Sequence, residues 1–209
     1  IISEGSARIA LPEGQVFYNP VQVFNRDLSV MAINQFCEMD SKRTSWSLLE
    51  ALSATGLRAV RYAGECPKLT KIVANDIDPE ASKLIALNAE ENKCSDKVSV
   101  SCGDANLVML QAAAGKQLFD IIDLDPYGSA APFLDSAMQA IADGGMLCIT
   151  CTDMAALCAS YTDACLAKYG SMPVKGDICH EFAVRIILNT VERAAARFRR
   201  SIEPLMSCA

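Results

Sequence analysis

From Trp46 onward, short apolar runs alternate with longer amphipathic stretches. The apolar runs predict strands at 47–52, 71–78, 97–102, 118–125 and 146–152. The stretches between them predict helices at 55–65, 79–92, 105–114 and 131–142. Such alternation is typical of βαβ units around a mainly parallel sheet, so we expect an α/β fold.

The two ends of the chain differ from this pattern. Residues 7–11 predict a short strand before Pro12, and residues 21–36 predict a helix. We interpret 1–45 as an N-terminal extension packed on the core, and 46–209 as the main domain. A long helix is expected from about Ile178 to Arg199, and a sixth strand could start after it. The chain ends there, so we expect the last strand of the sheet to be missing from it.

Composition favours a globular intracellular chain. Of the 209 residues, 51% are hydrophobic and 21% are charged, which suits one domain with a core. No apolar run is long enough to span a bilayer, and the start, Ile1, does not resemble a signal peptide. Because the chain opens on Ile1 rather than Met, we expect a piece of a longer protein, and we expect that protein to be intracellular. Its ten scattered cysteines indicate a reducing compartment rather than a disulfide scaffold.

Neither the cysteine pattern nor the single histidine predicts a metal site. Cys148 and Cys151 form a CxxC, but in a strand this spacing places them on opposite faces. No second CxxC completes a zinc site, so both are expected in the core. His180 is the sole histidine, and a structural hydrogen bond is its expected role.

The charge limits the nucleic acid contacts that this chain can make by itself. The formal net charge is −6 and the sequence pI is about 4.9, whereas nucleic-acid-binding proteins usually present a basic face. Only residues 192–201 are locally basic. If the substrate is a nucleic acid, most of its binding surface is expected outside this chain.

Polar residues gather where the expected strands end. In an open α/β sheet, ligands bind at the carboxyl ends of the strands. Those ends are residues 52–56, Asp76 with Asp78, residues 103–105, and residues 123–127. Packing alone does not explain acidic residues after successive strands.

The first of these loops favours an adenosine ligand without a pyrophosphate. Gly56 alone makes a poor pyrophosphate loop, which disfavours an NAD-dependent oxidoreductase. Asp76 follows at the spacing of a carboxylate that binds ribose hydroxyls. Asp104 could accept a hydrogen bond from the adenine amino group. These features point to S-adenosylmethionine; alternatively, Asp76 and Asp104 only cap the helices after them.

Asp125-Pro126-Tyr127 suits methylation of an amine on a base. An exocyclic amine is a poor nucleophile, so its nitrogen must be oriented and lose a proton as the new bond forms. A carboxylate and the proline carbonyl can accept its two N–H groups. The tyrosine ring offers a stacking platform. In the alternative interpretation, Asp125 only bonds local amides in a turn.

Together these stretches resemble a known family. EGSARI, FYNPVQVFNRD, LEALSATGLR, VANDIDP and DIIDLDPYG occur in the order found in tRNA (guanine-N2)-dimethyltransferases. The resemblance implies a class I S-adenosylmethionine-dependent methyltransferase fold, Rossmann-like, in 46–209. It also implies methylation of N2 of a tRNA guanosine, once or twice, near the junction of the D-arm and anticodon arm.

The resemblance also assigns site residues. It implies that the donor is contacted by Arg26, Arg58, Asp76, Asp104 and Ala105, and that Glu50 either orients the first loop or contacts the donor. Asp125 would be the catalytic carboxylate, with Pro126 and Tyr127 shaping the guanine pocket. Asp123 lies two residues earlier on the same strand face, so its expected role is only to support Asp125. Phe17 would close that pocket. Alternatively, Phe17 and Tyr18 pack the extension on the sheet, which we prefer for Tyr18, and Arg26 is a surface charge.

Two departures suggest a diverged paralogue. Val23 stands where the family usually has Glu, and KGDICHEFAVRIIL differs from the commoner CHEMALRIVL. This resembles the dimethyltransferase-like branch of higher eukaryotes. The alternative function is therefore a catalytically silent or retargeted RNA-binding paralogue. The family's main tRNA-binding domain is expected outside this chain. The resemblance places the protein in the nucleus or nucleolus, with the mitochondrion or cytoplasm as alternatives, and implies no membrane or metal.

Overall fold

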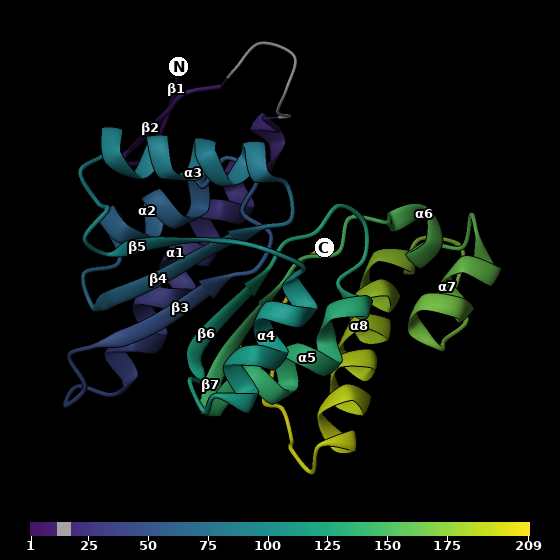
Figure 1. Cartoon of the computed structure of the whole chain (residues 1–209). Helices are drawn as coiled ribbons and strands as arrows, with labels where there is room; N and C mark the ends of the chain where they lie inside the picture. The colour runs from purple at the N-terminus through teal and green to yellow at the C-terminus, as the bar shows by residue number, and fades with distance from the viewer. Residues whose placement is uncertain (12–17) are drawn as a thin grey trace. The chain divides into compact units, whose positions relative to one another are not determined.

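The computed structural model describes residues 1–11 and 18–209, and its larger sheet has five strands (Figure 1). The strands lie in the order β5-β4-β3-β6-β7. Their bounds are Trp46–Glu50 (β3), Leu69–Asp76 (β4), Val98–Cys102 (β5), Phe119–Leu124 (β6) and Ile141–Ile149 (β7). β3 pairs in parallel with β4 and β6, and β4 pairs in parallel with β5. The expected α/β sheet is confirmed.

The chain divides into two compact units, which are described separately. Unit 1 comprises residues 1–124 and 140–148, and unit 2 comprises 125–139 and 149–209. The helices of unit 1 are α1 (Val23–Met39), α2 (Leu57–Glu65), α3 (Pro79–Glu91) and α4 (Ala105–Ala114). A 3-10 turn, η1 (Pro20–Gln22), leads into α1. All four helices lie within a few residues of the positions expected from the sequence.

Helix starts in unit 1 follow local sequence signals. The side chain of Asp78 accepts a hydrogen bond from the Glu80 amide, and Pro79 occupies the first turn of α3. Asp104 accepts hydrogen bonds from the amides of Asn106 and Leu107 at the start of α4. Each aspartate satisfies amides that have no partner inside the helix.

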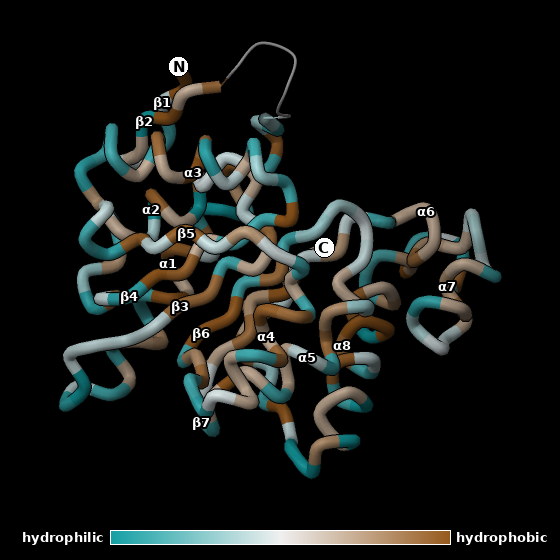
Figure 2. Tube along the Cα trace, viewed as in Figure 1, coloured by the Kyte–Doolittle hydropathy of each residue, from teal (hydrophilic) through white to brown (hydrophobic). Residues whose placement is uncertain are grey.

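Much of the core of unit 1 is formed by the central strand, β3, and its neighbour β6. Leu48 and Leu49 in β3, and Ile121 and Ile122 in β6, are fully buried. Figure 2 shows both strands predominantly in the hydrophobic colour, as expected for parallel strands covered on both faces.

The N-terminal segment adds a hairpin that the sequence revealed only in part. β1 (Ile2–Glu4) and β2 (Ala7–Ile9) pair antiparallel around Gly5, whose φ is +55°. Only the second strand was expected. Ala7 and Ile9 join Val30 and Ile33 of α1 in the same hydrophobic cluster as the sheet. Residues of the hairpin and of α1, both within the expected extension, therefore pack on the core of unit 1.

Unit 2 is largely helical and has a small hydrophobic cluster of its own. Its elements are η2 (Ala131–Phe133), α5 (Leu134–Ala140, whose last residue belongs to unit 1), α6 (Met154–Leu157), α7 (Thr162–Tyr169) and α8 (Cys179–Arg197). The cluster includes Leu157 from α6, Tyr169 from α7 and Ile186 from α8. The expected long helix is confirmed as α8, whereas α6 and α7 were not predicted because both are short.

Two expectations at strand ends were wrong. Gly144 and Gly145, expected to end a helix before a strand at 146, lie inside β7, which begins at Ile141. Residues 201–209 form no regular secondary structure, so no sixth strand begins there. Within residues 1–11 and 18–209, none of the helices combines the length and apolar character needed to cross a bilayer.

Candidate active site

The carboxyl ends of β3, β4 and β5 meet at one edge of unit 1, called here the carboxyl edge (residues 51–56, 76–78 and 102–105). The Ser53 amide donates to the carbonyl of Asn75 at 2.8 Å, and the Gly103 amide donates to the carbonyl of Asp76 at 3.0 Å. The side-chain amide of Asn75 donates to the carbonyls of Ala51 and Gly103, both at 3.0 Å. The structure thus brings three of the four expected loops together.

Asp76 holds the first loop rather than capping a helix. Its Oδ2 accepts from the Ala54 amide at 2.8 Å, and its Oδ1 accepts from the Asp78 amide at 3.0 Å. Because Asp78 caps α3, the capping alternative for Asp76 is wrong. For Asp104 the cap is present: Oδ1 accepts from Asn106 and Leu107, and Ala105 follows, buried, as the first residue of α4.

Gly56 is required by both its conformation and its surroundings. Its φ is +75°, and a Cβ at this position would lie 3.1 Å from Cγ2 of Ile85 in α3. The glycine therefore lets α3 pack closely against the first loop.

Sequence reasoning missed Ile77 at the carboxyl edge. Its apolar side chain is 69% exposed between two strand-end aspartates. A hydrophobic residue in that place is the signal that could have identified it as a candidate ligand contact.

A buried charged cluster lies beneath the start of α2. Arg58 Nη1 contacts Asp123 Oδ2 at 3.4 Å and the Tyr62 hydroxyl at 3.1 Å, and that hydroxyl donates to Asp123 at 2.5 Å. Glu50 Oε2 accepts from the Ala59 amide at 3.0 Å. Burial, and then the nearby Asp123 carboxylate, raises the pKa of Glu50 well above its usual range. These contacts hold α2 in position behind the first loop.

Arg26 is buried, so the alternative of a surface charge is wrong. Its guanidinium donates to both carboxylate oxygens of Glu4, at 2.7 and 2.6 Å, and to the carbonyl of Asn19 at 3.1 Å. Burial alone would raise the pKa of Glu4, but hydrogen bonds from Arg26, Tyr18 and Arg61 outweigh it and hold that pKa below the usual value. Neither of these hydrogen-bond partners of Arg26, Glu4 and Asn19, is one of the strand-end aspartates.

Tyr18 packs as expected, whereas the position of Phe17 is not described. The Tyr18 hydroxyl donates to Glu4 at 2.9 Å, and its side chain packs against the core cluster of unit 1. Phe17 lies outside the described residues.

In unit 2, the β6 loop (residues 125–128) carries the expected catalytic motif. Asp125, half-buried, directly follows β6, and Pro126 is buried. The Tyr127 side chain is 82% exposed. Gly128, with φ +83°, donates its amide to Thr152 Oγ1 at 3.0 Å, while the Thr152 amide donates to the Gly128 carbonyl at 2.7 Å. The loop is thereby fixed at its far end, with an aromatic ring presented to solvent.

The cysteines of the CxxC are half-buried and lie in different units. Cys148 packs against the core of unit 1 and Cys151 against the cluster of unit 2. Burial raises the pKa of both thiols. A different group was missed: the ligating atoms of Cys158, Cys179 and His180 lie within 4.8 Å of one another in unit 2. Cys158 lies 21 residues before the adjacent pair Cys179 and His180, which is not the spacing of a known zinc motif, so the sequence carries no signal of the group.

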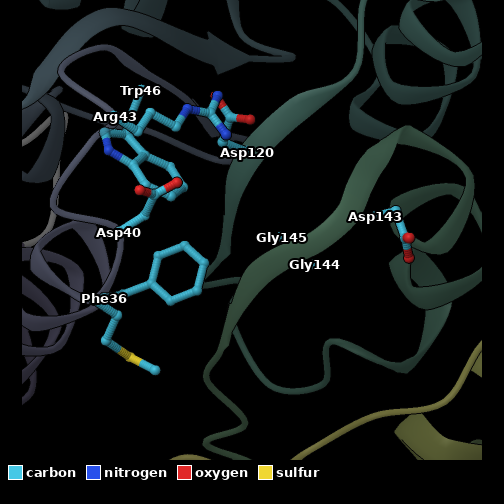
Figure 3. A pocket seen from close by; sticks show the side chains of 9 residues that line it. Phe36, Asp40, Arg43, Trp46, Asp120, Asp143, Gly144 and Gly145 are labelled. Carbon is cyan, nitrogen blue, oxygen red and sulfur yellow. The ribbon is translucent and has the colours of Figure 1, made fainter.

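A pocket of about 330 Å³ lies elsewhere in unit 1, at the starts of β3 and β6 (Figure 3). The Arg43 guanidinium lies 4.0 Å from the Trp46 ring centroid and 2.6 Å from Asp120. Phe36 packs edge-on against Trp46, with ring centroids 5.2 Å apart. Because the charged groups Arg43 and Asp120 pair with each other, and because ligands of open α/β sheets bind at the opposite strand ends, this pocket is a poor candidate for the donor site.

The strand order, the parallel pairing and the carboxylates after successive strands define the class I S-adenosylmethionine-dependent methyltransferase fold. A solved structure with this fold is Trm1 from Pyrococcus horikoshii in complex with S-adenosyl-L-methionine. It matches with a TM-score of 0.85 and 35% identity, covering 94% of this chain and 54% of that one.

The family model for N2,N2-dimethylguanosine tRNA methyltransferases matches residues 1–209, and the chain belongs to this family. The mouse tRNA (guanine(26)-N(2))-dimethyltransferase is 38% identical over 257 residues, covering 99% of this chain and 39% of the mouse protein. The mitochondrial enzyme of the same name from Saccharomyces cerevisiae is 37% identical, covering 99% and 45%. The chain thus spans less than half the length of these two relatives.

Proposed function

We propose that the chain transfers methyl groups from S-adenosylmethionine to the exocyclic N2 of a guanosine in tRNA, near the junction of the D-arm and anticodon arm. The observation that carries the proposal is the β6 loop: a carboxylate, a buried proline and an exposed aromatic ring directly follow a central strand. Membership in the family supports the same chemistry. We assign methyl transfer to residues 46–209 and treat 1–45 as their extension.

The carboxyl edge fits an adenosine-bearing methyl donor. It offers carboxylate oxygens from Asp76 and Asp104 for hydroxyl and amino groups, the backbone of Ala105, and the exposed side chain of Ile77 for a flat ring. Arg58, through Asp123, and Glu50, through the Ala59 amide, hold α2, the helix that follows the first loop. The donor, when bound, supplies an electrophilic methyl group on a sulfonium. Direct contact of Arg26 with the donor stays a prediction.

The β6 loop would orient the guanine and remove its proton. The Asp125 carboxylate accepts one N–H of the amine, and the carbonyl of Pro126 accepts the other, which directs the nitrogen lone pair at the methyl carbon. As the new C–N bond forms and the bond between the methyl carbon and the sulfonium sulfur breaks, Asp125 would take the proton that the nitrogen loses, and the donor would leave as S-adenosylhomocysteine. Tyr127 would stack on the base. Closure of the pocket by Phe17, which lies outside the described residues, stays a prediction.

The tRNA would bind mainly through surfaces beyond this chain. The net charge of −6 opposes binding to a phosphate backbone. The basic stretch of the chain, residues 192–201, contains four arginines in or just after α8: Arg193, Arg197, Arg199 and Arg200. We propose a nuclear or nucleolar location, with the mitochondrion or the cytoplasm as alternatives, on the basis of the family. None of the comparisons favours the catalytically silent alternative.

The Asp125→Asn variant tests the assignment. Asparagine keeps the size of the side chain and one acceptor oxygen but is a far weaker base. In the full-length protein, methyl transfer to a tRNA transcript should fall by about 100-fold or more, while calorimetry should show unchanged donor affinity. The parent protein should be inactive on a transcript carrying inosine at the target position, since inosine lacks the 2-amino group. Near-normal transfer by the variant, or methylation of inosine, would contradict the proposal.

Tyr127→Leu provides a second, smaller test at the same loop. A lost base-stacking contact corresponds to about 1–3 kcal/mol, so transfer at low tRNA concentration should fall at least about fivefold. Tyr127→Phe keeps the ring and serves as its control. Equal activities of the two variants would show that the ring does not contact the base.

A further inference from the structure

Three potential metal ligands converge in unit 2, outside the candidate active site. Cys158 directly follows α6, and Cys179 and His180 are the first two residues of α8. The sulfur atoms and one ring nitrogen all lie within 4.8 Å of one another. All ten cysteines of the chain are free thiols, so no disulfide accounts for the closeness of Cys158 and Cys179.

The spacing is close to that of a tetrahedral zinc centre. With Zn–S bonds of about 2.3 Å and Zn–N bonds of about 2.0–2.1 Å, ligand atoms on one tetrahedral ion lie about 3.6–3.8 Å apart. The observed group therefore needs to contract by at most about an ångström to hold the ion. Rotation about side-chain bonds supplies this, because His180 is exposed and both cysteines are only half-buried.

Charge and ligand type select the ion. Two thiolates and one neutral imidazole neutralise a divalent cation, and a mixed sulfur and nitrogen set favours zinc over magnesium or calcium.

We propose that Cys158, Cys179 and His180 bind one Zn²⁺ ion that joins the end of α6 to the start of α8. On binding, each thiol releases its proton to solvent and its sulfur bonds the metal. With three protein ligands, the fourth tetrahedral position belongs to water. The ion would reinforce a unit whose own hydrophobic cluster is small.

Zinc content of the whole 209-residue chain, purified under reducing conditions and desalted, tests the proposal. Inductively coupled plasma mass spectrometry should find one zinc per chain. Cys158→Ser, Cys179→Ser and His180→Asn should each weaken zinc binding by at least about 100-fold. Cys208→Ser is the matched control, an exposed thiol of the same unit that should leave zinc binding unchanged. Absence of zinc from the parent, or equal zinc in all variants, would overturn the site.

Cobalt substitution keeps the test informative if a variant fails to fold. The Co²⁺-loaded parent should show the visible bands of tetrahedral coordination and a thiolate-to-cobalt charge-transfer band. His180→Cys should retain the ion and strengthen the charge-transfer band, because a third thiolate replaces the imidazole. An octahedral spectrum, or a Cys158–Cys179 disulfide found by mass spectrometry of rapidly alkylated protein, would contradict the proposal.

Discussion

Two aspartates of the carboxyl edge in unit 1, Asp76 and Asp104, are fixed by backbone amides, whereas the tyrosine of the β6 loop in unit 2 is exposed to solvent. Asp76 accepts from two amides and Asp104 from two more. Tyr127 is 82% exposed. Under the proposed function, the donor meets groups that are already oriented, while the ring becomes covered only when the base stacks on it.

Because of this difference, donor binding and methyl transfer should be separable by mutation. Ordering a site before its ligand arrives lowers the entropy cost of binding. Substitutions of the hydrogen-bonded carboxylates of unit 1 (Glu4, Glu50 and Asp76) should therefore alter stability or donor affinity. Substitutions in the β6 loop should alter the rate of methyl transfer. The predictions below test the unit 1 side of this comparison.

The largest effect is expected at Glu4. This carboxylate is 7% exposed and pairs with Arg26 and with Arg61, whose Nη1 lies 2.9 Å away. Glu4→Gln leaves two buried guanidinium groups without their shared charge, so the free energy of unfolding should fall by about 3 kcal/mol. Urea unfolding measures it.

Glu181→Gln is the matched control for Glu4→Gln. Its ion pair with Arg185 joins exposed side chains four residues apart on α8, and such pairs contribute little. Equal losses in the two variants would show that burial of the Glu4 network does not matter to stability.

Asp76→Ala should give the next largest effect, on donor affinity. A hydrogen bond to a charged group contributes about 1.5–3 kcal/mol, so the dissociation constant for S-adenosylmethionine should rise by about 10-fold to 100-fold. Asp78→Ala removes a neighbouring aspartate that only caps α3, and should cost about 1 kcal/mol of stability without weakening the donor. Equal donor affinities of the two variants, measured by calorimetry, would refute the distinction.

The smallest effect is a pH dependence from Glu50. Burial raises its pKa above the usual value of 4.5, so the folded chain holds this proton more tightly than the unfolded chain. Its contribution to stability is therefore complete below that value and is lost as pH rises through the folded pKa. Relative to the parent, Glu50→Gln should gain stability as the pH rises from about 5 to about 8. A constant difference across that range would contradict the raised pKa.

Most elements of unit 1 were predictable because their signals are local. The apolar runs of β3 and β6 are continuous, and Asp78-Pro79 and Asp104 mark helix starts by capping chemistry. α6 and α7 were missed because four and eight residues are too short to show a helical period. The continuation of β7 through Gly144-Gly145 was missed because sheet pairing overrode a local turn signal.

The sequence by itself determined the order of the strands along the chain, the carboxylates at their ends and the family. Each of these is written in residue type and spacing, and strand ends in a parallel sheet must share one edge. Only the tertiary structure decided that Asp76 holds the Ala54 loop, that Arg26 is buried against Glu4, and that Cys158 meets Cys179 and His180. Those contacts join segments distant in the sequence, and packing rather than periodicity selects them.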